Sequence, residues 1–356
     1  SHRLPYSCAM LGSGLTGLMG LTELGCAIGF YALWALLWKV FYKSYPSKVV
    51  KQIFQDGRML YVISGDYTSK MIYDEIFGGK VYFKHGITLT GREAPLVLDV
   101  GGHVGMFAVF VAEAFPNSQI QIFEPVPLLA EAIQWNLDRF GCAVAGAGDQ
   151  EARVVLHKLA VGDEEMEISF KYDPRVSAGT SLFPKHSVPS KVDVIDLVRA
   201  LHLDGIRAGA FPELTRFLGR LLNIPVLRYV TFFALLPILL LYVLRMWASQ
   251  PMSLQAKVRP LSKILREQRL HGKCIDLLKV DVEGAEWKVL MGIDDETWTC
   301  IDQAVVEVHD CDEGRVMKIM ALLKAKGFHV VKEDPDFEIQ KVLKLYTVFA
   351  RRSNLK

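Results

Sequence analysis

The chain has 356 residues, a formal net charge of +2, 22% charged residues and 51% hydrophobic residues. Its length accommodates one large domain with additions, or two domains. A charge this close to neutral, without a basic stripe, argues against nucleic acid as a main partner. Six scattered cysteines with no C-x-x-C spacing favour reduced structural thiols over a disulfide framework or a zinc site.

The most apolar part of the chain lies near its beginning. Residues 8–38 carry a single charge, Glu23, and residues 24–42 are long enough to span a bilayer core of about 30 Å. The aromatic residues at the end of this segment are followed by basic ones: Lys39, Lys43, Lys48 and Lys51. This pattern predicts a transmembrane helix that leaves the following domain on the cytosol-like side. A helix buried inside a soluble domain is the alternative.

A strand, a glycine turn, a helix and a second strand follow one another between residues 95 and 125. The first strand, residues 96–100, contains Asp99 near its end, and the second, residues 120–123, ends in Glu124. The turn between strand and helix contains three glycines: Gly101, Gly102 and Gly105. Glycines allow close approach to a ligand, and an acid after the second strand suits ribose hydroxyls. Because an acid inside the turn repels phosphates but suits an ammonium and a sulfonium, S-adenosylmethionine is favoured over a dinucleotide. A tight turn in an ordinary α/β domain is the alternative.

Two later apolar runs also end in polar side chains. Residues 275–280 lead into Asp281 and Glu283, and residues 304–308 lead into His309. Central parallel strands carry functional groups at their C-terminal ends, so we expect both runs to be neighbouring strands of one sheet.

With these blocks, the chain resembles the FkbM-type family of S-adenosylmethionine-dependent methyltransferases over about residues 80–198 and 273–352. The matching motifs are Leu98–Gly105, Phe123-Glu124-Pro125, Ala160–Asp163, Lys279–Glu286 and Val306–His309. The resemblance implies an α/β, Rossmann-like class I methyltransferase sheet, mostly parallel with a closing antiparallel strand. It also implies O-methylation of a hydroxyl on a small acceptor, and a membrane anchor would favour a lipophilic one. His103 departs from the pattern, since the family more often has asparagine there.

The first part of the expected site holds the cofactor. The three glycines are expected at the methionine end, Asp99 at the ammonium and Glu124 at the ribose hydroxyls. Asp163, after the third strand, is expected near the adenine; a simple turn residue is the alternative.

The second part of the expected site carries the chemistry. His309 is the first candidate for a general base, with a structural hydrogen-bonding role as the alternative. Asp281 is expected to line the boundary between cofactor and acceptor, and Glu283 to orient the following helix. We predict no metal; the alternative is that Asp281, Glu283, Glu307 and His309 gather a divalent ion.

A hydrophobic insertion separates the two methyltransferase parts. Its apolar run, residues 229–244, spans about 24 Å as a helix, which is short for a bilayer core. One clean crossing would put the Asp99 and Asp281 motifs on opposite sides of the membrane. We therefore expect an interfacial or re-entrant segment, or one that packs on a partner, and a lid over the acceptor is the competing interpretation.

These observations predict five segments: 1–45 as a membrane anchor, 46–94 as a lead-in, 95–198 and 273–356 as the two parts of the methyltransferase domain, and 199–272 as a membrane-associated insertion. The expected partners are the lipid bilayer and membrane proteins contacting residues 8–42 and 211–248. Because the chain starts at Ser1, a removed targeting peptide and an organellar (chloroplast or mitochondrial) membrane are one expectation. A methyltransferase-like accessory or scaffold subunit of a membrane complex, with little or no activity, is the rival function.

Overall fold

The computed structural model describes residues 48–66, 68–146, 152–175, 177, 252–311 and 314–352. The chain divides into two units, Ser1–Pro46 and Ser47–Lys356, and every described residue belongs to the second. The predicted membrane segments 8–42 and 211–248 lie outside the described residues. Among the helices that are described, none combines the length and the apolar character needed to cross a membrane.

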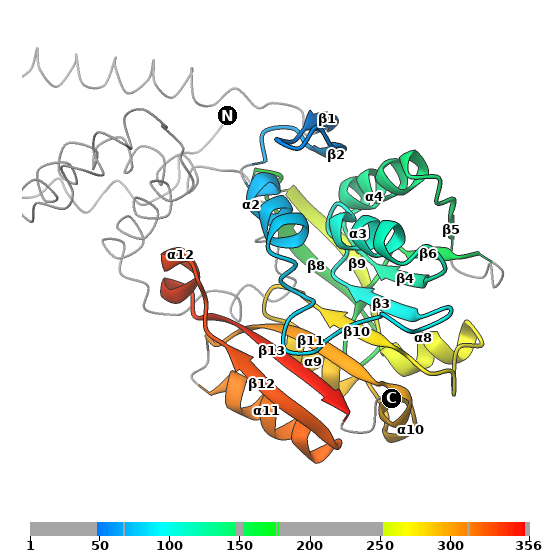
Figure 1. Ribbon diagram of the computed structural model, residues 1–356. Coiled ribbons are helices and arrows are strands. Elements are labelled where there is room, and N and C mark those ends of the chain that lie inside the picture. The colour runs from blue at the N-terminus through cyan, green and yellow to red at the C-terminus, as the bar shows by residue number, and fades with distance from the viewer. Residues whose placement is uncertain are drawn as a thin grey trace, which may run out of the picture. The chain divides into compact units, whose positions relative to one another are not determined.

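The centre of the second unit is an eight-stranded sheet with the order β12-β13-β11-β10-β3-β4-β6-β5 (Figure 1). Its strands are β3 (Leu96–Val100), β4 (Gln119–Phe123), β5 (Val144–Gly146), β6 (Val154–His157), β10 (Leu277–Val280), β11 (Gln303–His309), β12 (Phe328–Glu333) and β13 (Leu345–Arg352). All pairings are parallel except those of β13 with β11 and β12, which confirms the predicted closing antiparallel pair. The central strands are buried along their length and rich in Val, Leu and Ile, as strands covered on both faces must be.

Helices cover both faces of this sheet. They are α3 (Met106–Ala114), α4 (Pro127–Arg139), α8 (Leu261–Glu267), α9 (Glu286–Met291), α10 (Asp295–Cys300), α11 (Arg315–Ala325) and the short α12 (Glu338–Val342). Val97 of β3 packs into the same core cluster as residues of α3 and α4, whereas Leu98 and Val100 pack with residues of α8 to α11. Alternation along a strand thus divides the core into two layers.

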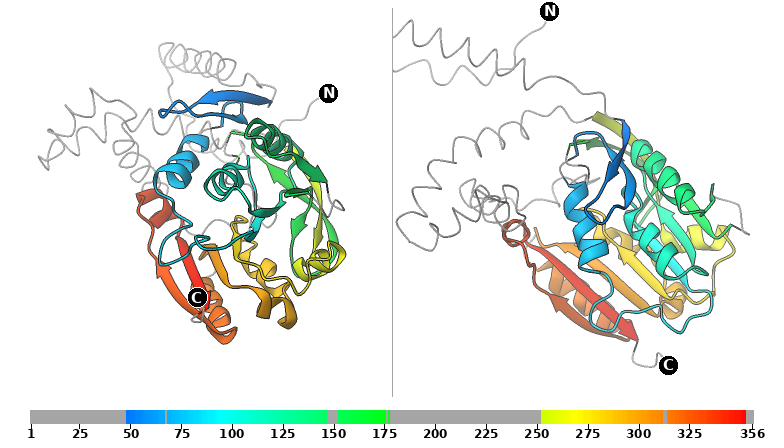
Figure 2. Two further views of the ribbon diagram at one scale, coloured as in Figure 1. Left: turned by 45° about the vertical axis from the view of Figure 1, so that its right-hand side comes forward. Right: turned by 45° about the horizontal axis from the view of Figure 1, so that its top comes forward.

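The lead-in segment forms structure of its own. It contains an antiparallel hairpin, β1 (Val49–Ile53) and β2 (Met59–Ile63), then α2 (Ser69–Tyr73) and a π-helical turn, η1 (Asp74–Gly78). Figure 2 shows the hairpin lying against α4. Asn136 of α4 is fully buried and bonds both the main chain of Tyr61 in β2 and the carbonyl of Val104 in the glycine turn. One satisfied amide therefore ties the lead-in to the turn that begins α3.

A separate three-stranded sheet has the order β7-β9-β8. It comprises β7 (Ala160–Val161), β8 (Met166–Tyr172) and β9 (Met252–Arg259). Residues 252–272, assigned to the insertion from sequence, form β9 and α8 and pack into the core. Tyr172 pairs with Met252, so the chain returns from residues 173–251 to the point where it left.

Strand order locates the crevice of the fold. From β3, the strands β4 and β6 lie on one side, and β10 and β11 lie on the other. In open parallel sheets, ligands bind outside the carboxyl ends of the strands where the order reverses. Here this point lies between the ends of β3 and β10, the strands that carry Asp99 and lead into Asp281.

Candidate functional site

The glycine turn after β3 is built to let the chain pack against its neighbours. Gly101 has φ +88°, and a Cβ there would overlap the carbonyl oxygen of Asp281. A Cβ on Gly102 would overlap the side chain of Ile122 in β4. The amides of Gly101 and Gly102 both donate to the carbonyl of Phe123, at 3.0 and 3.1 Å. These two glycines therefore fix the turn between β10 and β4, where a ligand in the crevice would lie.

His103 occupies a left-handed position in this turn, with φ +51°. Asparagine adopts this conformation with less strain than most residues, which is a physical reason for an asparagine preference there. The His103 ring extends to Ser177, with Nε2 2.6 Å from the hydroxyl oxygen. Burial lowers the pKa of His103, so the ring is neutral at physiological pH.

Glu124 follows β4 and is only 5% exposed. Its Oε2 accepts the His103 amide at 2.9 Å, and its Oε1 accepts the Val126 amide at 2.8 Å. Burial raises the pKa of Glu124 to about 8, although the two amide donors oppose this shift. Each carboxylate oxygen uses one lone pair on the backbone and keeps another for an external donor.

Lys279 lies at the centre of the crevice and joins β10 to β3. Its ammonium is 3.0 Å from Asp99 Oδ1 and 3.5 Å from Asp281 Oδ2, and it donates to the Gly101 carbonyl at 2.6 Å. Tyr82, from the lead-in segment, donates its hydroxyl to Asp281 Oδ2 at 2.9 Å. The predicted residues Asp99 and Asp281 are thus brought together, and a lysine bridges them.

Burial and pairing compete within this group. Burial raises the pKa of Asp99, which is fully inaccessible, and the nearby ammonium offsets only part of the rise. Burial alone would lower the pKa of Lys279, but the Asp99 and Asp281 carboxylates outweigh it and raise that pKa. Two acids facing one base leave an excess of negative charge at the switch point when both are ionised.

His309 ends β11 and is held between two carboxylates. Its Nε2 lies 2.9 Å from Glu283 Oε2, and its Nδ1 lies 3.0 Å from Glu286 Oε1. Arg315 contacts the other oxygen of Glu286 at 3.5 Å. Burial would lower the pKa of His309, but Glu283 and Glu286 raise it well above its usual value. Both ring nitrogens face carboxylate acceptors, an arrangement that favours the imidazolium form with both nitrogens donating.

Glu307 lies two residues before His309 on the same strand. Burial and the Asp281 carboxylate raise the pKa of Glu307 well above its usual value. The ligand atoms of Glu283, Glu307 and His309 all lie within 4.8 Å of one another. The structure thus gathers three of the four residues that the sequence put forward as an alternative metal site.

Asp163 lies in a different interaction. Its carboxylate pairs with Lys288 of α9 at 3.1 Å, and both side chains are about one-third exposed. Within the described part of the chain, the Asp163 side chain forms no hydrogen bond or ion pair with the glycine turn or with Glu124. The adenine role of Asp163 stays a prediction.

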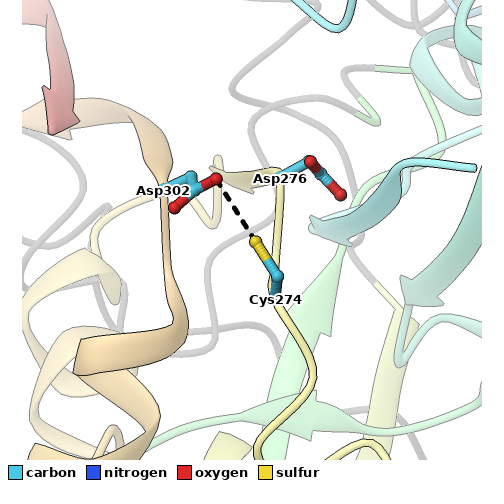
Figure 3. Close-up of side chains that lie close together, drawn as sticks. All are labelled: Cys274, Asp276 and Asp302. Atoms are coloured by element: carbon cyan, nitrogen blue, oxygen red, sulfur yellow. Dashed lines mark hydrogen bonds between the residues drawn. The ribbon is translucent and has the colours of Figure 1, made fainter. Parts of the chain in front are cut away.

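A second polar group, Cys274, Asp276 and Asp302, lies at the amino ends of strands β10 and β11 (Figure 3). Cys274 and Asp276 precede β10, and Asp302 precedes β11. The thiol donates to Asp302 at 3.2 Å, and Arg92 pairs with both aspartates, at 3.3 Å and 2.8 Å. Burial and the Asp302 carboxylate raise the pKa of Cys274 to about 12, so the thiol stays protonated. Arg92 supplies the positive charge here, and the group serves as a structural ion pair.

Sequence reasoning did not single out Lys279, Tyr82 or Glu286. A signal for Lys279 was present, because a lone lysine in a fully buried apolar strand requires a partner. For Tyr82 no local signal exists, since its partner Asp281 is 199 residues away in sequence.

The chain is similar to methyltransferases of known sequence and structure. The family model for the methyltransferase FkbM domain matches residues 253–330, which begin in β9 and end in β12. Methyltransferase 1 of Beauveria bassiana is 27% identical over 284 residues, covering 80% of this chain and 90% of its own length. Among solved structures, TYW2 of M. jannaschii, determined in complex with AdoMet, aligns with 86% of this chain and 89% of its own, with 9% identity and a TM-score of 0.36. A score at that level supports no conclusion about this chain.

The 31-O-demethyl-FK506 methyltransferase FkbM of Streptomyces tacrolimicus gives the strongest basis for a family assignment. It is 31% identical over 286 residues, covering 80% of this chain and 90% of its own length. The alignment is long enough to include both halves of the sheet described above. The chain therefore belongs to the FkbM methyltransferase family.

Proposed function

We propose that this protein is an S-adenosylmethionine-dependent methyltransferase that methylates a hydroxyl oxygen of a small or lipophilic acceptor. The observation that carries this proposal is the set of charges at the switch point, where Glu124 and Asp99 flank one glycine turn and Asp281 faces them across Lys279. The name of the Streptomyces relative, an O-methyltransferase of a small metabolite, supports oxygen as the acceptor atom.

The residues present fit this cofactor. In its ionised form, Glu124 retains one free lone pair on each carboxylate oxygen, which suits two ribose hydroxyls. The excess negative charge of Asp99 and Asp281 over Lys279 favours a ligand with an ammonium and a sulfonium. When bound, S-adenosylmethionine supplies an electrophilic methyl group; the protein aligns the acceptor oxygen and removes its proton.

The geometry favours Asp281 over His309 as the proton acceptor. Both nitrogens of His309 face carboxylates at hydrogen-bond distance, so neither is available to an incoming proton. The Asp281 side chain is 22% exposed at the crevice and is oriented by Tyr82. The role of His309 is then to hold Glu283 and Glu286 in place.

Calorimetric binding of S-adenosylhomocysteine to the purified full chain tests the cofactor assignment. The variant is Glu124→Gln, which keeps the shape but removes one acceptor oxygen. The matched control is Glu165→Gln, at an exposed carboxylate paired with Arg259 and Lys263. We expect binding to the parent and the control, and a loss of at least tenfold in affinity for Glu124→Gln. No binding to well-folded parent protein would overturn the enzyme and favour the accessory-subunit interpretation.

We also propose that residues 8–42 attach the protein to a membrane, with residues 211–248 at its interface and the methyltransferase domain on the cytosol-like side. The support is the apolar segment with its aromatic and basic flank. Alkaline carbonate extraction of membranes containing the full chain tests this proposal. Release of the protein into the supernatant would contradict a spanning anchor.

A further inference from the structure

We propose that Glu283, Glu307 and His309 form a site for a divalent cation such as Mn²⁺ or Mg²⁺, at the ends of β10 and β11. One carboxylate oxygen from each glutamate and the Nε2 of His309 would be the ligands. The open positions of the ion would take the oxygen of the acceptor; this second step rests on the proposed function, whereas ion binding does not.

The three ligand atoms are gathered closely enough that small side-chain shifts would bring them around one ion. They lie within 4.8 Å of one another, and the His309 Nε2 to Glu283 Oε2 distance is 2.9 Å. Two ligands at right angles around an ion, with bonds of about 2.1 Å, are about 3.0 Å apart. The distance of 2.9 Å between His309 Nε2 and Glu283 Oε2 therefore fits two arrangements: a hydrogen bond between the two atoms, or two ligands of one ion.

His309 is oriented as a metal-binding histidine is. Metal-ligating imidazoles usually donate their other N–H to a carboxylate, which fixes the tautomer and the ring plane. Here Nδ1 faces Glu286 Oε1 at 3.0 Å, and Glu286 is fully buried. Glu286 is itself held by the Gly284 amide at 2.6 Å and by Arg315. This support leaves Nε2 as the nitrogen that points toward Glu283 and Glu307.

Acids outnumber cations around Glu307, even with His309 counted as a cation. Among the residues that the structure describes, none forms a hydrogen bond or an ion pair with the Glu307 carboxylate. Asp281 and Glu75 are further acids that interact with Glu307 electrostatically. The Cys274 group at the other edge differs, since Arg92 pairs with both of its aspartates. Arg92 thus bridges the two aspartates of the Cys274 group, whereas no lysine or arginine among the described residues pairs with Glu283 or Glu307.

The position of the site connects it to the reaction. Glu283 lies two residues after Asp281, which borders the crevice beside Lys279. An ion here would lie on the β10–β11 side, away from Glu124 on β4, and would leave the cofactor half of the crevice unchanged. Hard divalent ions with mixed oxygen and imidazole ligands keep exchangeable water positions, which a hydroxyl oxygen can occupy.

Titration of the purified full chain with MnCl₂, followed by the electron paramagnetic resonance signal of free Mn²⁺, tests the site. We expect one ion per chain, displaced by excess Mg²⁺. Glu307→Gln and Glu283→Gln should each weaken binding at least tenfold. The matched control, Asp302→Asn in the other group, should leave it unchanged. No uptake by the parent, full binding by Glu307→Gln, or a loss with Asp302→Asn would each overturn the proposal.

Electron spin-echo modulation of the bound Mn²⁺ gives a readout that needs no variant. A ¹⁴N coupling from one imidazole is expected, and a spectrum without directly bound nitrogen would contradict His309 as a ligand. S-adenosylhomocysteine binding is measured in the same samples, where Glu307→Gln should retain it. Ion binding without cofactor binding would overturn the proposed function alone, and the reverse result would overturn the metal site alone.

Discussion

Replacement of Lys279 by methionine should be strongly destabilising, and the effect should depend on pH. The change removes the ammonium 3.0 Å from Asp99, a carboxylate with no exposed surface. At an effective dielectric constant of about 20, one such pair is worth about 5 kcal/mol, and removing one partner of a buried pair typically costs about 3–5 kcal/mol. The hydrogen bond to the Gly101 carbonyl is lost as well.

Protonation of Asp99 limits this penalty. Adding a proton to a carboxyl with an unfolded pKa near 3.9 costs about 4 kcal/mol at pH 7 but only about 1.5 kcal/mol at pH 5. In the variant, burial raises the pKa of Asp99 further, so the folded state binds more protons than the unfolded state as pH falls. The difference in unfolding free energy between the parent and Lys279→Met should therefore decrease by about 2–3 kcal/mol when the pH is lowered from 7 to 5.

Urea unfolding of the full chain at both pH values measures the effect. Lys263→Met is the matched control, since its ammonium pairs only with the exposed Glu165 and should cost less than about 1 kcal/mol. In the double variant Asp99→Asn with Lys279→Met, at least half of the lost stability should return at pH 7. A loss for Lys279→Met no larger than that of the control, or one independent of pH, would refute the reasoning.

Three further expectations follow from the geometry. Burial raises the pKa of Glu124 to about 8, above its unfolded value, so the contribution of this group to stability is lost as the pH rises through about 8. Thermal unfolding should therefore show that Glu124→Gln loses less stability than the parent between pH 6 and pH 9. Gly101→Ala should fail to fold or lose more than about 4 kcal/mol of unfolding free energy, because its Cβ would overlap Asp281. The control Gly141→Ala, at φ +69° in open space, should lose only about 1–2 kcal/mol in urea unfolding. In metal-free protein, the ring nitrogens of His309 should keep imidazolium ¹⁵N shifts from pH 6 to pH 8, because Glu283 and Glu286 raise its pKa; a titration within that range would contradict the assignment.

Sequence alone predicted the elements whose signals are local. The glycine turn, the strand before it and the helix Met106–Ala114 appear where expected, because buried apolar runs and turn glycines act over a few residues. The β12–β13 pair is confirmed for the same reason. The FkbM resemblance is confirmed by the relatives, and it rests on these same short blocks.

Sequence alone did not predict which acids would be paired. Asp99 was expected to hold a ligand ammonium, yet its nearest cation is Lys279, 180 positions later. For His309 the sequence left a base and a structural hydrogen-bonding role open; Glu283 and Glu286, 26 and 23 residues earlier, raise its pKa. Such roles depend on partners brought together by strand order, which a reading of neighbouring residues does not contain.

The polar contacts at the two ends of β3 indicate what the buried Asp99–Lys279 pair contributes to the site. At its start, the Leu96 amide donates to Asp276 Oδ2 at 2.8 Å; just past its end, the Gly101 carbonyl accepts from Lys279 at 2.6 Å. Both partners belong to the β10 side, so β3 and β10 are joined at each end. A slip of one residue would turn every side chain to the other face of the sheet, and a strand that is apolar on both faces has no polar–apolar alternation to oppose the slip. Apolar replacements for a buried pair are often as stable as the pair itself, so stability alone does not account for Lys279 and Asp99. Their pairing instead fixes the register that sets Asp99 opposite Lys279 and places Asp281 beside the glycine turn.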